Sequence, residues 1–310
     1  MKFSVIIPTY NRADLLKVCL ESLVAQSFKD FEVIVCDDGS TDNSKEIVEL
    51  FHAHLNLTYF YEENWGGPAR PRNNGIRLSR GEWLAFLDSD DYWSSHKLET
   101  INNYISKGEV FYHRMIVLNE KNVQISSINS KDIKMPVFET MLVEGNRIPL
   151  SSVVCRKSKV LEAGGFSEEK KFIAVEDFDL WLKLSLLKCE FLFVPEFLGF
   201  YYAGGGNISQ ASLKQIKKLR SIYLKYLPYI LDKSTKRQVI GSFYYQKFRM
   251  IFMMDRDPEN YSILKKAFLF SNFKTKIKII VVFIVEFCNL IALYRKARLL
   301  LSLRFMGRNN

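Results

Sequence analysis

Over the first hundred residues, short apolar runs rich in β-branched and aromatic side chains alternate with stretches in which apolar residues recur every three or four positions. The first pattern predicts strands and the second predicts helices. The predicted strands are Phe3–Ile7, Phe31–Cys36, Leu57–Tyr61 and Trp83–Leu87. The predicted helices are Ala13–Ala25, Asn43–His52 and Asn73–Arg80. This alternation indicates an α/β fold with parallel strands joined by right-handed crossovers.

The pattern is less regular between residues 109 and 200. Strand-like runs occur at Val110–Tyr112, Val153–Cys155 and Phe191–Val194, and helical spacing returns over residues 176–187. After about residue 202, long stretches rich in Lys, Tyr and Leu and poor in acidic residues predict helices. We therefore expect two domains, an α/β domain over residues 1–205 and a basic helical region over residues 206–310.

Charge separates these two regions further. The net charge is +10, but residues 201–310 alone contain 21 Lys and Arg against 5 Asp and Glu. Such a surplus indicates an anionic partner, either nucleic acid or the anionic leaflet of a membrane. The aromatic residues of this region recur at helical spacing beside Leu and Ile, which is typical of core rather than of an exposed stacking platform for nucleic acid. We expect membrane contact and no nucleic acid.

The most apolar stretch, residues 277–294, bears on the same question. A membrane-spanning helix needs about 20 apolar residues, and this stretch is interrupted by Glu286 and Asn289. Lysines precede it and Arg295, Lys296 and Arg298 follow it. This arrangement favours a helix that lies on an anionic lipid surface, and a buried core helix is the alternative.

Cysteine usage and the N-terminus suggest the compartment. The five cysteines are dispersed and form no CxxC pair, which favours reduced thiols in the cytosol. The first residues, MKFSVIIPTYNR, have no cleavable signal pattern. We expect a cytoplasmic protein that is peripheral at the inner face of the cell membrane.

Acidic residues follow two of the predicted strands. Asp37 and Asp38 come directly after Phe31–Cys36, and Asp88-Ser89-Asp90 with Asp91 follows Trp83–Leu87. Ligands of open α/β sheets bind beyond the carboxyl ends of the strands. Clustered carboxylates raise each other's pKa unless a cation compensates, and Mg²⁺ and Mn²⁺ prefer oxygen ligands together with substrate phosphates. The cluster therefore indicates a site for Mn²⁺ or Mg²⁺, although a solvated acidic loop would explain this one motif equally well.

Further motifs decide the interpretation by their order. They are Pro8-Thr9-Tyr10-Asn11-Arg12, Asp37-Asp38-Gly39-Ser40, Arg72-Asn73-Asn74-Gly75-Ile76, the acidic cluster, Gly164-Gly165-Phe166 and Glu176-Asp177-Phe178-Asp179-Leu180-Trp181. The set resembles the family-2 inverting glycosyltransferases of GT-A fold, of the type that builds bacterial surface polysaccharides. The resemblance covers residues 1–205. It implies a Rossmann-like mixed sheet flanked by helices and transfer of a sugar from a nucleotide-diphospho-sugar to a hydroxyl of a glycan acceptor.

The resemblance also implies a donor site. It implies that the nucleotide sugar is contacted by Pro8, Thr9, Tyr10, Asp38, Arg72, Asp88 and Ser89. Within this set, Asp38 hydrogen-bonds the nucleobase of the donor. A carboxylate that accepts a hydrogen bond from uracil favours UDP. Asp88 lies near the ribose, and Asp90 binds the metal ion that bridges the donor phosphates. For the turn at Asp37-Asp38-Gly39, plain strand-to-helix geometry is the alternative explanation.

The resemblance also implies a general base for the inverting reaction, at the second acidic pair, Glu176-Asp177. Asp177 matches it, and we expect the N-terminus of its helix to favour the ionised carboxylate; an ordinary helix cap is the alternative. Glu176 and Asp179 position neighbours or contact the acceptor. Trp181 belongs to the core, or forms an aromatic floor under a sugar. Residues 201–209 lack the histidine that many relatives carry near the metal, which argues against a protein ligand there.

A lipid-linked acceptor accounts for the basic, aromatic-rich C-terminal region, because a polyprenyl diphosphate offers both negative charge and apolar length. Two other hypotheses remain open. One is a non-catalytic module that binds a nucleotide sugar. The other is a soluble transferase that acts on proteins or small molecules and does not need the C-terminal residues.

Overall fold

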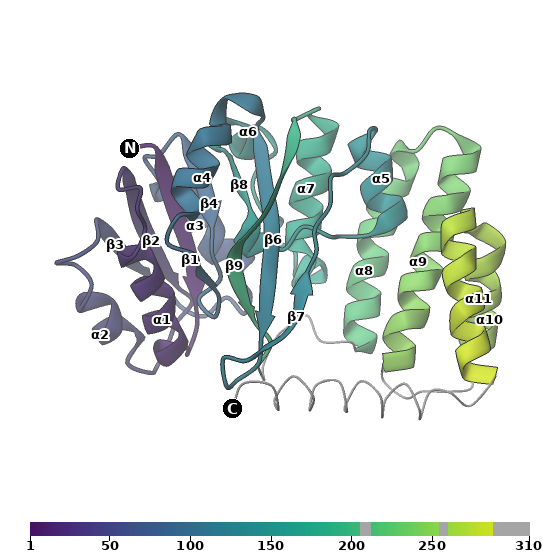
Figure 1. Ribbon diagram of the computed structural model, residues 1–310, viewed down its shortest axis with the longest axis horizontal. Coiled ribbons are helices and arrows are strands. Elements are labelled where there is room, and N and C mark those ends of the chain that lie inside the picture. Colours follow the sequence, from purple (N-terminus) through teal and green to yellow (C-terminus); the bar gives the residue numbers. More distant parts are fainter. Residues whose placement is uncertain (205–211, 254–259, 288–310) are drawn as a thin grey trace. The chain divides into compact units, whose positions relative to one another are not determined.

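A computed structural model describes residues 1–204, 212–253 and 260–287 (Figure 1). The chain divides into two compact units, which are described separately. The first consists of Met1–Gln210 and Lys217–Ile222, and the second of Ala211–Ile216 and Tyr223–Asn310. Part of the apolar stretch 277–294 and most of the 201–209 segment lie outside the described residues, so the expectations placed there stay predictions.

One mixed sheet organises the first unit. Its strands are β1 (Phe3–Thr9), β2 (Phe31–Asp37), β3 (Leu57–Tyr61), β4 (Trp83–Phe86), β5 (Tyr92–Trp93), β6 (Val110–Leu118), β7 (Gln124–Ile128), β8 (Val154–Arg156) and β9 (Phe191–Tyr202). Their order is β3-β2-β1-β4-β8-β6-β9-β5, and β7 pairs with β6. The first four strands are parallel, as their sequence pattern predicts. β8 is antiparallel to both β4 and β6, which makes the sheet mixed.

Helices cover both faces of this sheet. They are α1 (Ala13–Val24), α2 (Ser44–Glu49), α3 (Ala69–Leu78), α4 (Lys97–Tyr104), α5 (Val137–Glu144), α6 (Lys157–Glu162) and α7 (Glu176–Leu186), with short 3₁₀ turns η1 (Ile105–Lys107), η2 (Leu150–Ser152) and η3 (Lys170–Phe172). The buried residues of α1 pack on the β1 face that carries Phe3, Val5 and Ile7. α3 covers the opposite face, where a Cβ on Gly75 would come within 2.5 Å of the Ile6 side chain. Glycine at this position therefore lets α3 approach β1 closely.

Several elements differ from the sequence prediction. Helix α3 begins at Ala69 rather than at Asn73, directly after Pro68, and Pro71 falls in its first turn, where proline is tolerated. β9 extends eight residues beyond the predicted Phe191–Val194, to Tyr202. The short elements α4, α5, α6, β5 and β7 carry too few periodic residues for a sequence pattern to identify them.

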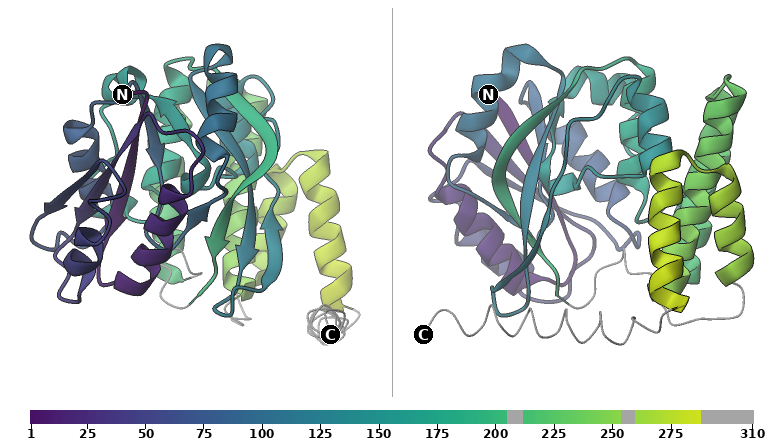
Figure 2. Two further views of the ribbon diagram at one scale, coloured as in Figure 1. Left: turned by 60° about the vertical axis from the view of Figure 1, so that its left-hand side comes forward. Right: turned by 45° about the vertical axis from the view of Figure 1, so that its right-hand side comes forward.

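The C-terminal elements are helical: α8 (Leu213–Tyr226), η4 (Leu227–Tyr229), α9 (Lys233–Met253), α10 (Asn260–Phe270) and α11 (Phe273–Phe287). Residues 217–222 of α8 belong to the first unit, and the other described residues of these elements belong to the second. Helices α9, α10 and α11 lie side by side (Figure 2). The core of the second unit consists of Ile216 from α8 together with Phe248, Ile251, Ile263, Leu264, Ala267 and Ile279. Across the described residues, none of the helices combines the length and the apolar character needed to cross a bilayer.

Candidate active site

The carboxyl ends of β1, β2 and β4 line a single cavity of about 630 Å³. It brings together residues that the sequence separates by more than 160 positions. Of the predicted site residues, the cavity is lined by Pro8, Thr9, Tyr10, Asp38, Arg72, Asp88, Ser89, Asp90, Glu176 and Asp177. This is the edge at which ligands of open α/β sheets bind.

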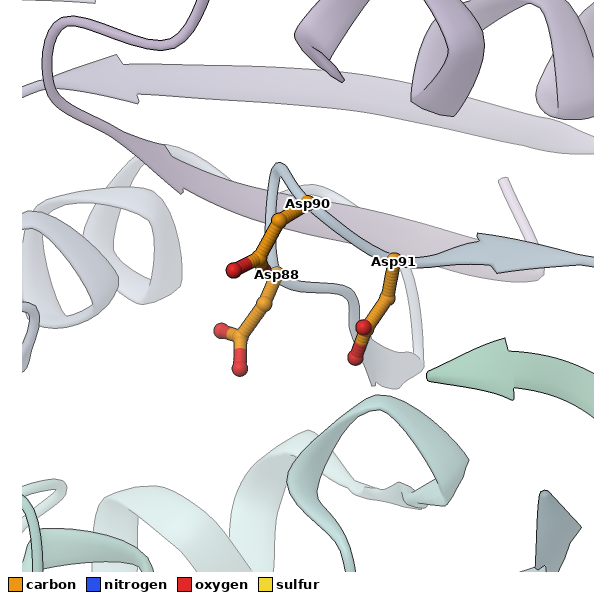
Figure 3. Close-up of side chains that lie close together, drawn as sticks. All are labelled: Asp88, Asp90 and Asp91. Atoms are coloured by element: carbon orange, nitrogen blue, oxygen red, sulfur yellow. The ribbon is translucent and has the colours of Figure 1, made fainter. Parts of the chain in front are cut away.

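Three aspartates form the acidic centre of the cavity. Asp88, Asp90 and Asp91 extend to the same side of the loop between β4 and β5 (Figure 3), with ligand oxygens within 4.8 Å of one another. Burial, followed by the charges of its two neighbours, raises the pKa of Asp91 well above its usual range. Burial and the charge of Asp88 also raise the pKa of Asp90. Within the described residues this is the one such cluster of acidic, His or Cys side chains, and its oxygen donors fit a hard divalent cation.

Two arginines compensate the aspartates. Arg12 forms an ion pair with Asp90. The guanidinium of Arg72 donates to Asp88 Oδ1 and to Glu176 Oε1, both at 2.7 Å. The resemblance implies contact between Arg72 and the nucleotide sugar; in the structure this buried side chain lines the cavity and joins the β4–β5 loop to the first turn of α7.

Asp38 organises the rim of the cavity on the β2 side. Its carboxylate accepts hydrogen bonds from the backbone N–H groups of Trp65, Gly66 and Gly67, at 2.8, 3.1 and 3.3 Å. Gly66, Gly67 and Pro68 in turn line the cavity. Asp38 therefore fixes the loop that precedes α3, in addition to facing the cavity itself. Gly39 adopts φ +86°, a conformation that favours glycine.

Asp177 faces the cavity from the first turn of α7. Its Oδ1 accepts a hydrogen bond from Phe178 N at 2.6 Å, and its Oδ2 accepts one from Asn146 Nδ2 at 2.8 Å. Burial, followed by the charge of Glu176, raises the pKa of Asp177 to about 7. We expected the helix N-terminus to favour ionisation, but desolvation and the neighbouring carboxylate outweigh that effect and the net shift is in the opposite direction.

Two of the predicted acceptor residues do not line the cavity. Asp179 is fully buried and forms an ion pair with Lys183 at 3.0 Å. Trp181 is also fully buried, so its ring belongs to the core and offers no surface to a sugar. Asp179 lies on the opposite side of α7 from Asp177, whereas Trp181 follows Asp177 by one turn on the same side and is covered by the rest of the domain.

The sequence did not single out one wall of the cavity. This wall consists of residues from the segment between α5 and η2 and the first residue of η2: Asn146, Arg147, Ile148, Pro149 and Leu150. No periodicity or motif distinguishes these residues in the sequence. Arg12, by contrast, lies within the first quoted motif, although no role was assigned to it.

Comparison with known proteins identifies the family. The pattern of the family described as "Glycosyl transferase family 2" matches residues 4–156, which include β1, the Asp37-Asp38 turn and the acidic cluster. The chain carries a family-2 glycosyltransferase domain. The family expected from the motifs is thereby confirmed, with a match over residues 4–156.

Two relatives and one solved structure illustrate the similarity. The poly(ribitol-phosphate) beta-N-acetylglucosaminyltransferase TarS of Staphylococcus aureus is 29% identical over 263 residues, which is 80% of this chain and 44% of TarS. The Escherichia coli UDP-Glc:alpha-D-GlcNAc-diphosphoundecaprenol beta-1,3-glucosyltransferase WfaP is 27% identical over 181 residues, 58% of this chain and 69% of WfaP. The crystal structure of S. aureus TarS 1-349 in complex with UDP-GlcNAc has a TM-score of 0.66 and 26% identity, and covers 86% of this chain and 79% of that one.

The structural similarity confirms the GT-A fold expected for the first domain. The chain spans less than half the length of TarS and of the poly(ribitol-phosphate) beta-glucosyltransferase of Bacillus spizizenii, 44% and 39% respectively.

Proposed function

We propose that this protein is an inverting glycosyltransferase that transfers a sugar from a UDP-sugar to a hydroxyl of a surface-glycan acceptor. One observation carries the proposal: a single cavity contains the nucleotide-side residues Pro8 to Tyr10, the acidic cluster around Asp90 and the candidate base Asp177. These are the parts that one in-line displacement needs on its two sides.

The donor side of the cavity fits a nucleotide diphosphate. Tyr10 lines the cavity with 47% of its surface exposed, which leaves its ring available to a base. The TarS complex with UDP-GlcNAc supports a UDP-sugar as donor. Asp38, Arg72, Asp88 and Ser89 complete the proposed donor site.

Asp90 is the proposed ligand of Mn²⁺ or Mg²⁺, with Asp88 and Asp91 beside it. When bound, the cation would compensate the negative charge of the departing diphosphate. The chemistry of the donor set supports it, because three buried or half-buried carboxylates so close together favour a counter-charge. Arg12 and Arg72 supply part of that charge from the protein.

Asp177 is the proposed general base on the acceptor side. Its carboxylate takes the proton of the acceptor hydroxyl while that oxygen forms a bond to the anomeric carbon. The bond from this carbon to the diphosphate breaks, UDP leaves with the electron pair, and the configuration inverts. Glu176 is held by Arg72 beside Asp177 and serves as a positioning residue.

We further propose a lipid-linked or polymeric glycan acceptor and a peripheral location at the cytoplasmic face of the membrane. WfaP is named for a diphosphoundecaprenol-linked acceptor, and TarS for poly(ribitol phosphate). On α11, Phe273, Ile277, Ile280 and Val281 are 79, 47, 45 and 53% exposed. They recur at one-face spacing beside Lys276 and Lys278, which suits contact between residues 206–310 and anionic lipid.

Release of UDP tests the proposal. Purified full-length protein is incubated with UDP-GlcNAc or UDP-Glc, Mn²⁺ and either a sugar linked to a lipid diphosphate or poly(ribitol phosphate). We expect acceptor-dependent release that stops in chelator and returns with Mn²⁺ or Mg²⁺. Asp90→Asn and Asp177→Asn should abolish it while tryptophan fluorescence stays native. Asp14→Asn, at an exposed position of α1, is the matched control and should remain active.

The other hypotheses give different results. UDP binding with no release from any donor would identify a binding module. Transfer to small free acceptors that survives removal of residues 275–310 would identify a soluble transferase. Full turnover by Asp177→Asn would remove the assignment of the base.

A further inference from the structure

Asn146 contacts Asp177 from the wall formed by residues 146–150, which no sequence motif had indicated. It follows α5 and precedes η2, and it lines the same cavity as Asp177. Its side chain takes part in two hydrogen bonds. Asn146 Nδ2 donates to Asp177 Oδ2 at 2.8 Å, and Ile148 N donates to Asn146 Oδ1 at 3.1 Å.

The second of these hydrogen bonds determines which way the amide points. A backbone N–H can only donate, so the Ile148 N–H must meet the carbonyl oxygen of Asn146. The NH₂ group of Asn146 is then the part that faces Asp177. Because this group can only donate, it favours the ionised carboxylate, whose oxygens only accept.

The carboxylate of Asp177 is therefore held at both oxygens. Phe178 N–H donates to Oδ1 from α7 itself, and Asn146 donates to Oδ2 from the segment between α5 and η2. Two donors from different elements restrict rotation of the carboxylate about its bond to Cβ. The carboxylate retains further lone pairs that can accept the proton of an acceptor hydroxyl.

We propose that Asn146 is a positioning residue for sugar transfer, which holds Asp177 as an oriented, ionised carboxylate towards the acceptor hydroxyl. The inference rests on the proposed function, because it takes Asp177 to be the base. It assigns a task in the reaction to a loop outside the family motifs quoted above.

The surroundings of Asp177 explain why such a donor matters. Glu176 on the same helix adds a like charge, and burial disfavours ionisation. Arg72 from α3 opposes these effects but is shared with Asp88 and Glu176. The other charged side chains that line the cavity are Arg12, Asp38, Asp90, Asp91 and Arg147. A substitution at Asn146 leaves all of these groups in place.

The test is the pH dependence of kcat/KM for the acceptor, at saturating donor. In Asn146→Ala the acidic limb should move to higher pH by about one unit, as for loss of one hydrogen bond to a charged group. The rate should fall about tenfold below the limb and recover at alkaline pH, while the KM for the UDP-sugar stays unchanged. Asn146→Asp should move the limb further, because it places a second carboxylate beside Asp177. Asn103→Ala, at an exposed position of α4 outside the cavity, should keep the wild-type profile.

The outcomes separate this inference from the proposed function. If Asp177→Asn is inactive and Asn146→Ala keeps the wild-type limb, whether or not its rate falls equally at every pH, Asn146 does not hold Asp177 as an ionised carboxylate, so this inference is wrong and the base assignment stands. If Asp177→Asn is fully active, the base assignment and this inference fail together. Should Asn146→Ala not fold, the nearly isosteric Asn146→Asp decides the question, and an unshifted limb in that variant overturns the inference.

Discussion

Replacement of Arg72 by methionine would remove the cation that joins two walls of the cavity. Its side chain is 5% exposed and lies 2.7 Å from both Asp88 and Glu176, and the Glu176 side chain is also only 5% exposed. Removing one partner of a buried ion pair costs about 3–5 kcal/mol, because the remaining charge stays buried without compensation. We therefore expect Arg72→Met to lower the free energy of unfolding of the first unit by about 3–5 kcal/mol.

Two further variants test whether the lost charge is the cause. Arg70 lies on the same helix, but its side chain is 45% exposed and pairs with Glu62 at 3.2 Å. A surface pair contributes about 0–1 kcal/mol, so Arg70→Met should have little effect. Adding Glu176→Gln to Arg72→Met should recover part of the loss, because it removes the uncompensated buried carboxylate.

Urea unfolding monitored by tryptophan fluorescence measures these differences. The four tryptophans, at positions 65, 83, 93 and 181, all lie in the first unit, so the signal reports on that unit alone. Equal losses for Arg72→Met and Arg70→Met would refute the reasoning. So would a double variant that is less stable than Arg72→Met, since the charge of Glu176 would then not be the source of the cost.

The remaining predictions concern pH, packing and lipid. Because the pKa of Asp177 is raised to about 7, its basic form is depleted below neutrality, and kcat/KM should rise about tenfold between pH 6 and 8; stopped assays of UDP release across this range would contradict it with a flat profile. Gly75→Ala should destabilise the first unit by about 1–3 kcal/mol in urea unfolding, because its Cβ would lie 2.5 Å from the Ile6 side chain; a variant as stable as the wild type would show that α3 can move away at no cost. Phe273→Glu with Ile277→Glu should reduce flotation with vesicles that contain phosphatidylglycerol and leave UDP binding unchanged; undiminished flotation would rule out the exposed face of α11 as the lipid contact.

The sequence determined the first half of the sheet because each element there has its own local signature. Phe3–Thr9, Phe31–Asp37 and Trp83–Phe86 are fully buried strands, and buried parallel strands are continuous apolar runs that are visible without any tertiary information. Acidic residues directly after such runs must fall at the edge where ligands bind. Asp38 and Asp90 could therefore be predicted to face a ligand cavity from their position after the strands, and both line it. The family followed from the order of the motifs.

The tertiary structure decided the partners of these residues. The sequence gives no indication that Arg72 bridges Asp88 and Glu176, because the contact with Glu176 joins positions 104 residues apart. Asp179 and Trp181 are on the same helix as Asp177, but both are buried: Asp179 lies on the opposite side of the helix, and Trp181, one turn further along the same side as Asp177, is covered by the rest of the domain. Local pattern does not reveal which side of a helix faces a cavity until its packing is known.

The ionisation of Asp177 and its contact with Asn146 were equally beyond the sequence. In the local sequence, the helix N-terminus favours an ionised Asp177 and the neighbouring Glu176 disfavours it, but the sequence does not give the relative size of these effects or the degree of burial. Burial and the charge of Glu176 act in the opposite direction and are stronger here. Both depend on the surrounding protein, because desolvation is set by the walls that close around a group. The sequence thus determined the family, the strands and the chemical groups, and the fold determined which of these groups meet and in which protonation state.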